Sequence, residues 1–191
     1  MERSLITAAI AAPLLAFTVA ATDWKLDNAH ANLRFNITHM GINDVEGSFK
    51  VFSSSITATK DDLSDAVVEF SADAKSIDTG SERRDGHLRS ADFFDVEKYP
   101  TITFKSTAFT KVSEGKYKVK GDLTMRGVTK PVELDATARF ASNPRSNKPM
   151  VNFKVTGTID RVQFGVGESG MGKATLSDEV SLTANLPYGQ E

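Results

Sequence analysis

Apolar and polar residues alternate along most of the chain after residue 22, with the period of two that is typical of strands with one apolar face. Leu33, Phe35 and Ile37 share a face of the first such run. The alternation recurs in residues 68–74, 132–140, 151–159 and 180–186. We count about eight predicted strands, many of roughly ten residues or more, which is longer than the usual five or six.

These predicted strands must bury their apolar faces, either by closing on themselves or by packing as two sheets. Turn signals at residues 60–62, 113–115 and 126–127 separate the runs. The connections are short, whereas a Greek key needs long ones. We therefore predict one all-β domain, folded as an antiparallel up-and-down barrel.

One segment in the middle of the chain interrupts the alternation. Thr79 and Glu82 fit a capping box, which predicts a short helix over residues 83–90 between two strands. Asp85 and Arg89 have the i, i+4 spacing of a helix salt bridge.

The predicted inner face mixes bulky and small residues. The small ones are Ala72, Ala74, Gly121, Ala136, Ala138, Gly157 and Ala184. Because a solid core uses large side chains to reach close packing, these positions favour an elongated apolar cavity. The alternative is that neighbouring Phe side chains fill the gaps. Strands of about twelve residues would extend roughly 40 Å, a length that suits a long-chain lipid.

The inward side chains that we expect to contact such a lipid come from most of the predicted strands. They are Leu33, Phe35, Ile37, Phe49, Val68, Phe70, Phe104, Val119, Leu123, Leu134, Phe153, Val155 and Leu182. Arg84 and His87, at i and i+3 of the predicted helix, share a face and are candidates to hold a phosphate or carboxylate head group. A purely structural polar cluster is the alternative for this pair.

The N-terminus differs from the rest of the chain. Residues 5–21 carry no charge, and Val19-Ala20-Ala21 fits the small-x-small cleavage rule. We predict a secretory signal peptide over residues 1–21 and a mature domain over residues 22–191, with an uncleaved signal anchor as the alternative. The chain of 191 residues has no cysteine, so an exported domain would depend on its apolar core. We expect a bacterial periplasmic or secreted protein.

Charge and motifs exclude other classes of function. The net charge of −2 gives no basic footprint for a nucleic acid. The three histidines have no recognised metal-ligand spacing, so we expect no metal site. Residues 167–174 nearly spell a phosphate-binding loop, but Ala174 lacks the required hydroxyl and a strand is predicted where the motif needs a helix, which favours a flexible glycine loop. No nucleophile motif is present, so we predict no catalytic residue and no cofactor.

Several short blocks run in order along the mature chain. They are Trp24-Lys25-Leu26-Asp27, His39-Met40-Gly41-Ile42, Ser76-Ile77-Asp78-Thr79-Gly80, Arg84 to Asp95, Tyr99-Pro100, Gly121 to Val132, Ile159 to Gly165 and Leu176-Ser177-Asp178. In this order they resemble the YceI family of bacterial lipid-binding proteins. The resemblance implies an extended eight-stranded lipocalin-like barrel, in the periplasm, that holds a polyisoprenoid or similar amphiphile, with no established catalytic residue.

The resemblance also sets the expected partners. The ligand would be an isoprenoid quinone, a prenyl phosphate or a similar lipid, and an unidentified membrane donor or acceptor protein would exchange it. Dimers occur in the family, so a homodimer is among the expected states. Two other hypotheses stay open: an enzyme on a lipid or prenyl phosphate, with His87 or Asp85 as acid or base, and a stress-linked interaction protein whose barrel is filled.

Overall fold

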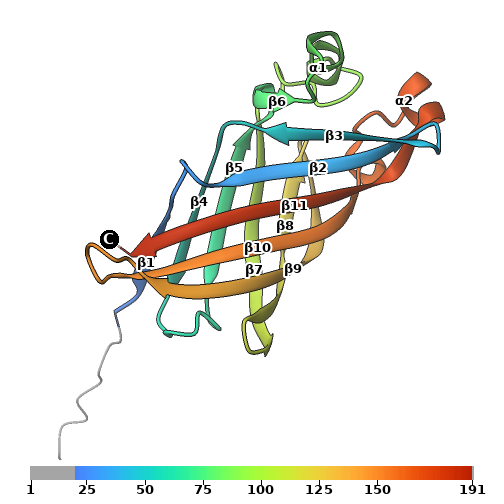
Figure 1. Cartoon of the computed structure of the whole chain (residues 1–191). Helices are drawn as coiled ribbons and strands as arrows, with labels where there is room; N and C mark the ends of the chain where they lie inside the picture. Colours follow the sequence, from blue (N-terminus) through green and yellow to red (C-terminus); the bar gives the residue numbers. More distant parts are fainter. Residues whose placement is uncertain (1–19, 191) are drawn as a thin grey trace, which may run out of the picture.

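The computed structural model describes residues 20–190 and forms a closed antiparallel barrel (Figure 1). Its strands are β1 (Thr22–Leu26), β2 (Asn32–His39), β3 (Asn43–Phe49), β4 (Phe52–Ala58), β5 (Val67–Asp73), β6 (Ile77–Asp78), β7 (Thr101–Ser113), β8 (Lys116–Met125), β9 (Val128–Ser142), β10 (Pro149–Asp160) and β11 (Leu176–Gln190). The helices are α1 (Glu82–Arg89) and α2 (Gly170–Thr175), with 3-10 turns at Ala74–Ser76 and Val162–Phe164. Residues 1–19 of the predicted signal peptide lie outside the described residues.

The eleven strands occupy eight positions around the barrel, which we call staves. Three of these staves are bent, and each of the three consists of two strands. β1 and β2 both pair with β11, and they pair on their other side with β4 and β3 respectively. In the same way, β3 and β4 form one bent stave, and β5 and β6 another. Neighbours along the chain are neighbours in the sheet, so the predicted eight-stranded up-and-down barrel is confirmed.

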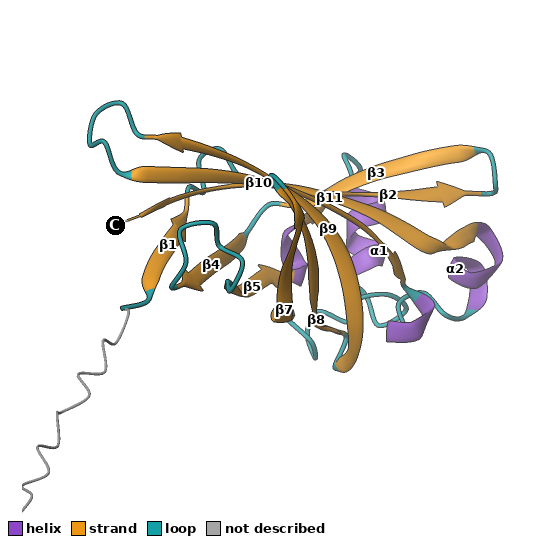
Figure 2. Cartoon of the chain, turned by 90° about the horizontal axis from the view of Figure 1, so that it is seen from below, coloured by secondary structure: helices purple, strands orange, loops and turns teal. Residues whose placement is uncertain are grey.

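The barrel has two distinct ends. In Figures 1 and 2, α1 and α2 gather at one end and β1 lies at the other. One group of buried side chains, which includes Trp24 and Tyr188, fills the β1 end. A second group, which includes Phe93 and Phe164, lies beneath the helices. Within residues 20–190, no helix has the length and apolar character needed to cross a bilayer.

The segment between β6 and β7, residues 79–100, contains the predicted helix, and we call it the helical excursion. Its contacts differ from those predicted. Ser81, not Thr79, is the N-cap residue, and it makes no side-chain capping bond. The Thr79 hydroxyl instead donates to the buried Asp85 carboxylate, at 2.6 Å. It therefore does not cap the helix as predicted. Arg89 pairs with Glu82, at 3.1 Å, and the predicted pairing of Asp85 with Arg89 is therefore wrong.

The glycine-rich segment also differs from its prediction. We expected a flexible loop over residues 167–174, whereas α2 forms from Gly170 to Thr175. The side chain of Thr175 donates to the Met171 carbonyl, at 2.7 Å, and closes the last turn. Contacts with Arg161 and Asp92, which lie outside the strands, hold this segment in place.

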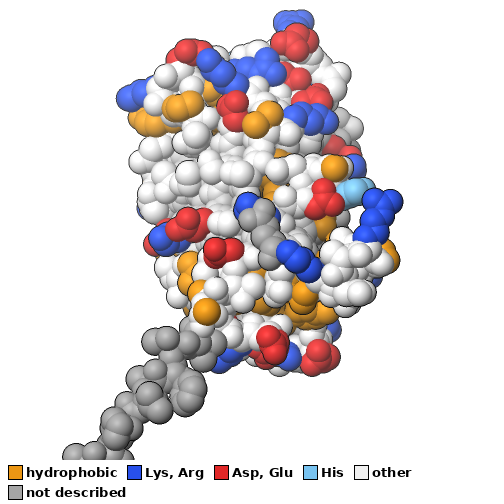
Figure 3. All heavy atoms as spheres, turned by 90° about the vertical axis from the view of Figure 1, so that its left-hand side faces the viewer, with side chains coloured by type: hydrophobic (Ala, Val, Ile, Leu, Met, Phe, Trp, Pro, Cys, Tyr) orange, Lys and Arg blue, Asp and Glu red, His pale blue; other side chains and the backbone are white. Residues whose placement is uncertain are grey.

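On the face shown in Figure 3, acidic and basic side chains are interspersed. This distribution agrees with the small net charge of −2. Oppositely charged side chains also pair across the outside of neighbouring strands, as Lys118 does with Glu133 and Asp135. Such exposed pairs contribute little to stability.

Candidate functional site

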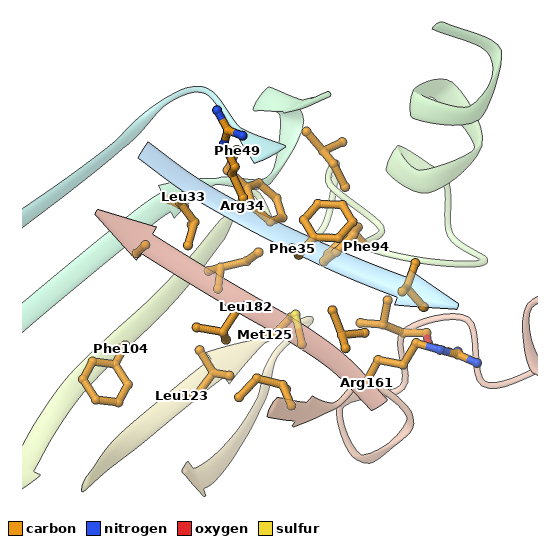
Figure 4. Close-up of a pocket in the computed structure, with 18 of the residues that line it drawn as sticks. Leu33, Arg34, Phe35, Phe49, Phe94, Phe104, Leu123, Met125, Arg161 and Leu182 are labelled. Carbon is orange, nitrogen blue, oxygen red and sulfur yellow. The ribbon is translucent and has the colours of Figure 1, made fainter. Parts of the chain in front are cut away.

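An apolar cavity of about 540 Å³ occupies the barrel and is lined by residues of both core groups (Figure 4). This volume lies in the range of ligand sites, which is about 300–1,000 Å³. The lining comes mainly from the inward positions of β2, β5, β7, β8, β9, β10 and β11. Alternation along each strand places one side chain in every two toward this space.

All thirteen side chains predicted from alternation line the cavity: Leu33, Phe35, Ile37, Phe49, Val68, Phe70, Phe104, Val119, Leu123, Leu134, Phe153, Val155 and Leu182. Nine of them are only half-buried although they point inward, which agrees with open space beside them. Their contact with a lipid stays a prediction. The cavity weighs against the hypothesis of a filled barrel.

The small inner residues explain only part of this space. A Cβ on Gly121 would collide with the Phe104 ring, and one on Gly157 with the Leu134 side chain. At Gly121 a Phe side chain fills the gap, as the alternative interpretation held, and at Gly157 a Leu side chain does so. Of the small residues predicted on the inner face, Ala72, Ala136 and Ala184 line the cavity, whereas Ala74 and Ala138 do not.

A cluster of aromatic rings lies at the β1 end of the cavity. Phe109 lies 4.9 Å from Tyr117 and 5.6 Å from Phe153, between ring centroids, and Phe153 lies 6.3 Å from Tyr188. The Tyr117 hydroxyl donates to the Asp62 carbonyl at 2.7 Å. The rings meet mostly edge to face, and all four are buried, so they close this end of the cavity.

We call this closed end the floor of the cavity, and Tyr188 brings a second hydroxyl to it. This hydroxyl donates to Ser54 Oγ at 2.7 Å. Burial raises the pKa of Tyr188 to about 12. The floor is therefore uncharged at neutral pH, which suits an apolar chain end.

At the other end, Arg161 organises the glycine-rich segment. Its buried guanidinium donates to the carbonyls of Val166 and Gly167, both at 2.7 Å, and of Gly172, at 3.1 Å. It also reaches the carbonyl oxygens of Ser177 and Leu176. Burial lowers the pKa of Arg161, while the Asp178 carboxylate counteracts this. Because its guanidinium donates to five backbone carbonyls, Arg161 has a structural role: it holds the glycine-rich segment against the cavity wall.

Arg126 joins this segment to the loop after α1. Its guanidinium donates to the carbonyl oxygens of Gly165 and Ala91. The Gly167 N–H donates to the Asp92 carbonyl, at 3.1 Å, and strengthens the same junction. The helical end is therefore capped by a connected set of loops.

An opening remains between α1 and the edge of β3. β3 pairs with β6 only through Ser48 and Phe49, so residues 43–47 have no strand partner on that side within the described chain. Asn43 on β3 and Arg84 on α1 are both exposed and both line the cavity. The cavity therefore reaches the surface here.

Arg84 and His87 lie at this mouth, as a head-group site would require. Arg84 donates from Nε to Thr79 Oγ and from Nη2 to the Thr79 carbonyl, both at 2.7 Å. His87 Nε2 lies 3.3 Å from Asp92 Oδ2, and its ring packs on Phe93. Both side chains line the cavity, yet their bonds within the excursion also fit a structural role. Binding of a head group stays a prediction.

Several lining residues were not predicted. Ile102, Met125 and Ile159 continue the alternation of their strands, so the same signal marks them. Leu88 and Phe94 come from the helical excursion, where alternation stops and no periodic signal exists. Phe94 lies 5.7 Å from Phe49, between ring centroids, and joins the excursion to β3.

Known proteins share this sequence pattern and architecture. A UPF0312 protein of Vibrio cholerae is 32% identical over 173 residues, which cover 89% of this chain and 92% of that protein. BcnA of Burkholderia cenocepacia has a similar structure, with a TM-score of 0.75 and 27% identity over 85% of this chain and 98% of BcnA.

A polyisoprenoid-binding domain from Saccharophagus degradans shares the fold, with a TM-score of 0.64 and 16% identity over 88% of this chain and 98% of that domain. The sequence model of the YceI-like domain matches residues 24–188, which are nearly the whole barrel. The chain therefore belongs to the YceI family.

Proposed function

We propose that this protein binds a polyisoprenoid or another long-chain amphipathic lipid in its barrel and carries it in the periplasm. The observation that carries the proposal is the apolar cavity of about 540 Å³, closed by aromatic rings at one end and open beside α1. The polyisoprenoid-binding domain of Saccharophagus degradans, which has the same fold, supports this class of ligand.

The shape of the site favours an amphiphile with its tail inside. Burial of the chain against residues such as Leu123, Leu134 and Leu182 would supply most of the affinity, at about 25 cal/mol per Å² of apolar surface. A quinone or phosphate head group would lie at the mouth, within reach of Arg84 and His87.

Binding without turnover is the function that the site supports best. Asp85, one of the two candidate acid–base residues, does not line the cavity and accepts two hydrogen bonds from Thr79. His87 is the other candidate. Turnover of a prenyl phosphate that disappears in His87→Ala, with lipid binding intact, would favour the enzymatic alternative.

The test compares a variant that fills the cavity with one that does not. Leu182 is half-buried and points into the cavity, whereas Thr183, the next residue of β11, is exposed. We expect Leu182→Trp to lower the amount of co-purified lipid, and the affinity for added lipid, by roughly tenfold or more, because the indole occupies the volume of the chain. Thr183→Trp should behave as wild type.

Lipid extraction and mass spectrometry of the purified proteins measure the outcome. Circular dichroism confirms that both variants keep the barrel. The proposal fails if the wild-type protein neither contains nor takes up a long-chain lipid, or if the two tryptophan variants bind lipid equally well.

A further inference from the structure

Three large apolar side chains are exposed together at the helical end of the barrel. Ile42 is 90% exposed, Met171 69% and Met40 63%, and we call these three residues the apolar rim. Single exposed apolar residues are normal on protein surfaces, so their grouping is the informative observation.

Two elements hold the apolar rim together. Met40 and Ile42 lie at the tip between β2 and β3, and Met171 lies on α2. The Met40 N–H donates to the Thr175 carbonyl at 2.6 Å, which joins the tip to α2. Figures 1 and 2 both show the β2–β3 tip beside α2 at the same end of the molecule.

The tip projects from the barrel. Met40 and Gly41 both have positive φ, at 55° and 71°, as in the tight turns that reverse a hairpin. A Cβ placed on Gly41 would meet nothing within 4 Å. The left-handed conformation costs a non-glycine residue such as Met40 some stability, and here it turns the chain so that Ile42 stands almost fully in solvent.

The apolar rim borders the cavity mouth. Met171 lines the cavity, as do Asn43 beside Ile42 and Thr175 beside the tip. Met171 thus belongs both to the cavity wall and to the rim, and Ile42, the most exposed large apolar residue described, lies next to a lining residue. A lipid that leaves the cavity by this route meets the rim first.

We propose that the apolar rim docks on a lipid bilayer, so that a lipid passes between the bilayer and the cavity without crossing water. This inference rests on the proposed function. Apolar side chains at such a surface insert into the boundary between head groups and acyl chains. Lys173 lies near the rim, but Glu168 and Asp44 are also exposed there, so apolar insertion supplies the attraction and an anionic lipid is not required.

The experiment measures flotation with phosphatidylcholine vesicles, with and without phosphatidylglycerol. The test variant combines Ile42→Ser with Met171→Ser. The matched control combines Val112→Ser with Val67→Ser, which removes exposed apolar side chains at the opposite end, near the β7–β8 and β4–β5 turns (Figure 1). We expect the test variant to partition to vesicles roughly tenfold less for each side chain removed, and the control to match wild type.

A second measurement follows solanesol, a long-chain polyisoprenoid alcohol, from phosphatidylcholine vesicles into the protein. The test variant should load more slowly from vesicles but reach the wild-type content when it is loaded from detergent micelles. If all proteins, wild type included, fail to load from micelles, the proposed function itself fails.

The docking inference is overturned on its own if micelles load every protein and the test variant still takes solanesol from vesicles as fast as wild type. It is also overturned if the test variant changes only the oligomeric state in light scattering, because a second copy of the chain would then cover the rim.

Discussion

At the scale of single residues, the barrel floor has a titratable group that is held neutral. The hydroxyl of Tyr188 is buried and its pKa is about 12, against an ordinary value of 10.0. The folded protein therefore binds this proton more tightly than the unfolded chain does. The stability that this proton contributes is complete below pH 10.0 and is lost as the pH rises toward about 12.

We expect this single group to remove about 3 kcal/mol of unfolding free energy across that range. Tyr188→Phe should lose about 1 kcal/mol at neutral pH, because the hydrogen bond to Ser54 is absent, and should show a shallower alkaline decline. Urea unfolding from neutral pH to about pH 12 measures both quantities. Identical alkaline slopes in the two proteins would contradict the assignment to Tyr188.

At the scale of elements, the β8–β9 turn holds the helical excursion in place. Gly127 has a φ of 74°, and a Cβ at this position would lie 2.5 Å from the Tyr99 ring. Gly41 has a similar φ of 71°, but no atom lies within 4 Å of its added Cβ. The two glycines therefore separate the cost of the backbone conformation from the cost of displacing Tyr99.

We expect Gly41→Ala to lower the unfolding free energy by about 1 kcal/mol, from the positive φ alone. Gly127→Ala should lower it by roughly 2–3 kcal/mol, because Tyr99 must also move. Urea unfolding gives both values. Equal losses would mean that the Tyr99 ring shifts freely and does not fix the excursion on the turn.

The sequence predicts the strands well but does not predict the helix α2. Alternation identifies the strands and their inward faces, because the period of two follows from strand geometry alone. It does not identify α2, because the segment is held by carbonyl contacts with Arg161, a residue on the far side of a turn. The capping box wrongly predicts Thr79 as the helix N-cap, because a local motif does not reveal that the Thr79 hydroxyl donates to Asp85.

At the scale of the whole molecule, the cavity is a property of the closed barrel and of no single strand. The pattern of small residues suggested open space, yet Gly121 and Gly157 are covered by larger neighbours. Which small residue leaves a gap depends on the register that brings two strands together, as with Leu134 over Gly157. Register is set by the turns and by the closure of the barrel, so the pattern of small residues within one strand does not reveal it.

An empty apolar cavity lowers the stability of the folded state, because its lining has no partner atoms on one side. A bound lipid should offset this loss. At a free concentration about 100 times its dissociation constant, a ligand raises the unfolding free energy by about 2.7 kcal/mol. For a domain of this size, that corresponds to a rise of roughly 5–10 °C in the melting temperature.

We therefore expect removal of lipid from the purified protein to lower its melting temperature by that amount, and reloading to restore it. Leu182→Trp fills the cavity and should melt at the same temperature with or without lipid, whereas Thr183→Trp should respond as wild type does. Differential scanning calorimetry of matched samples measures these shifts. A lipid-dependent shift of equal size in all three proteins would place the bound lipid outside the barrel and separate the cavity from the function proposed for it.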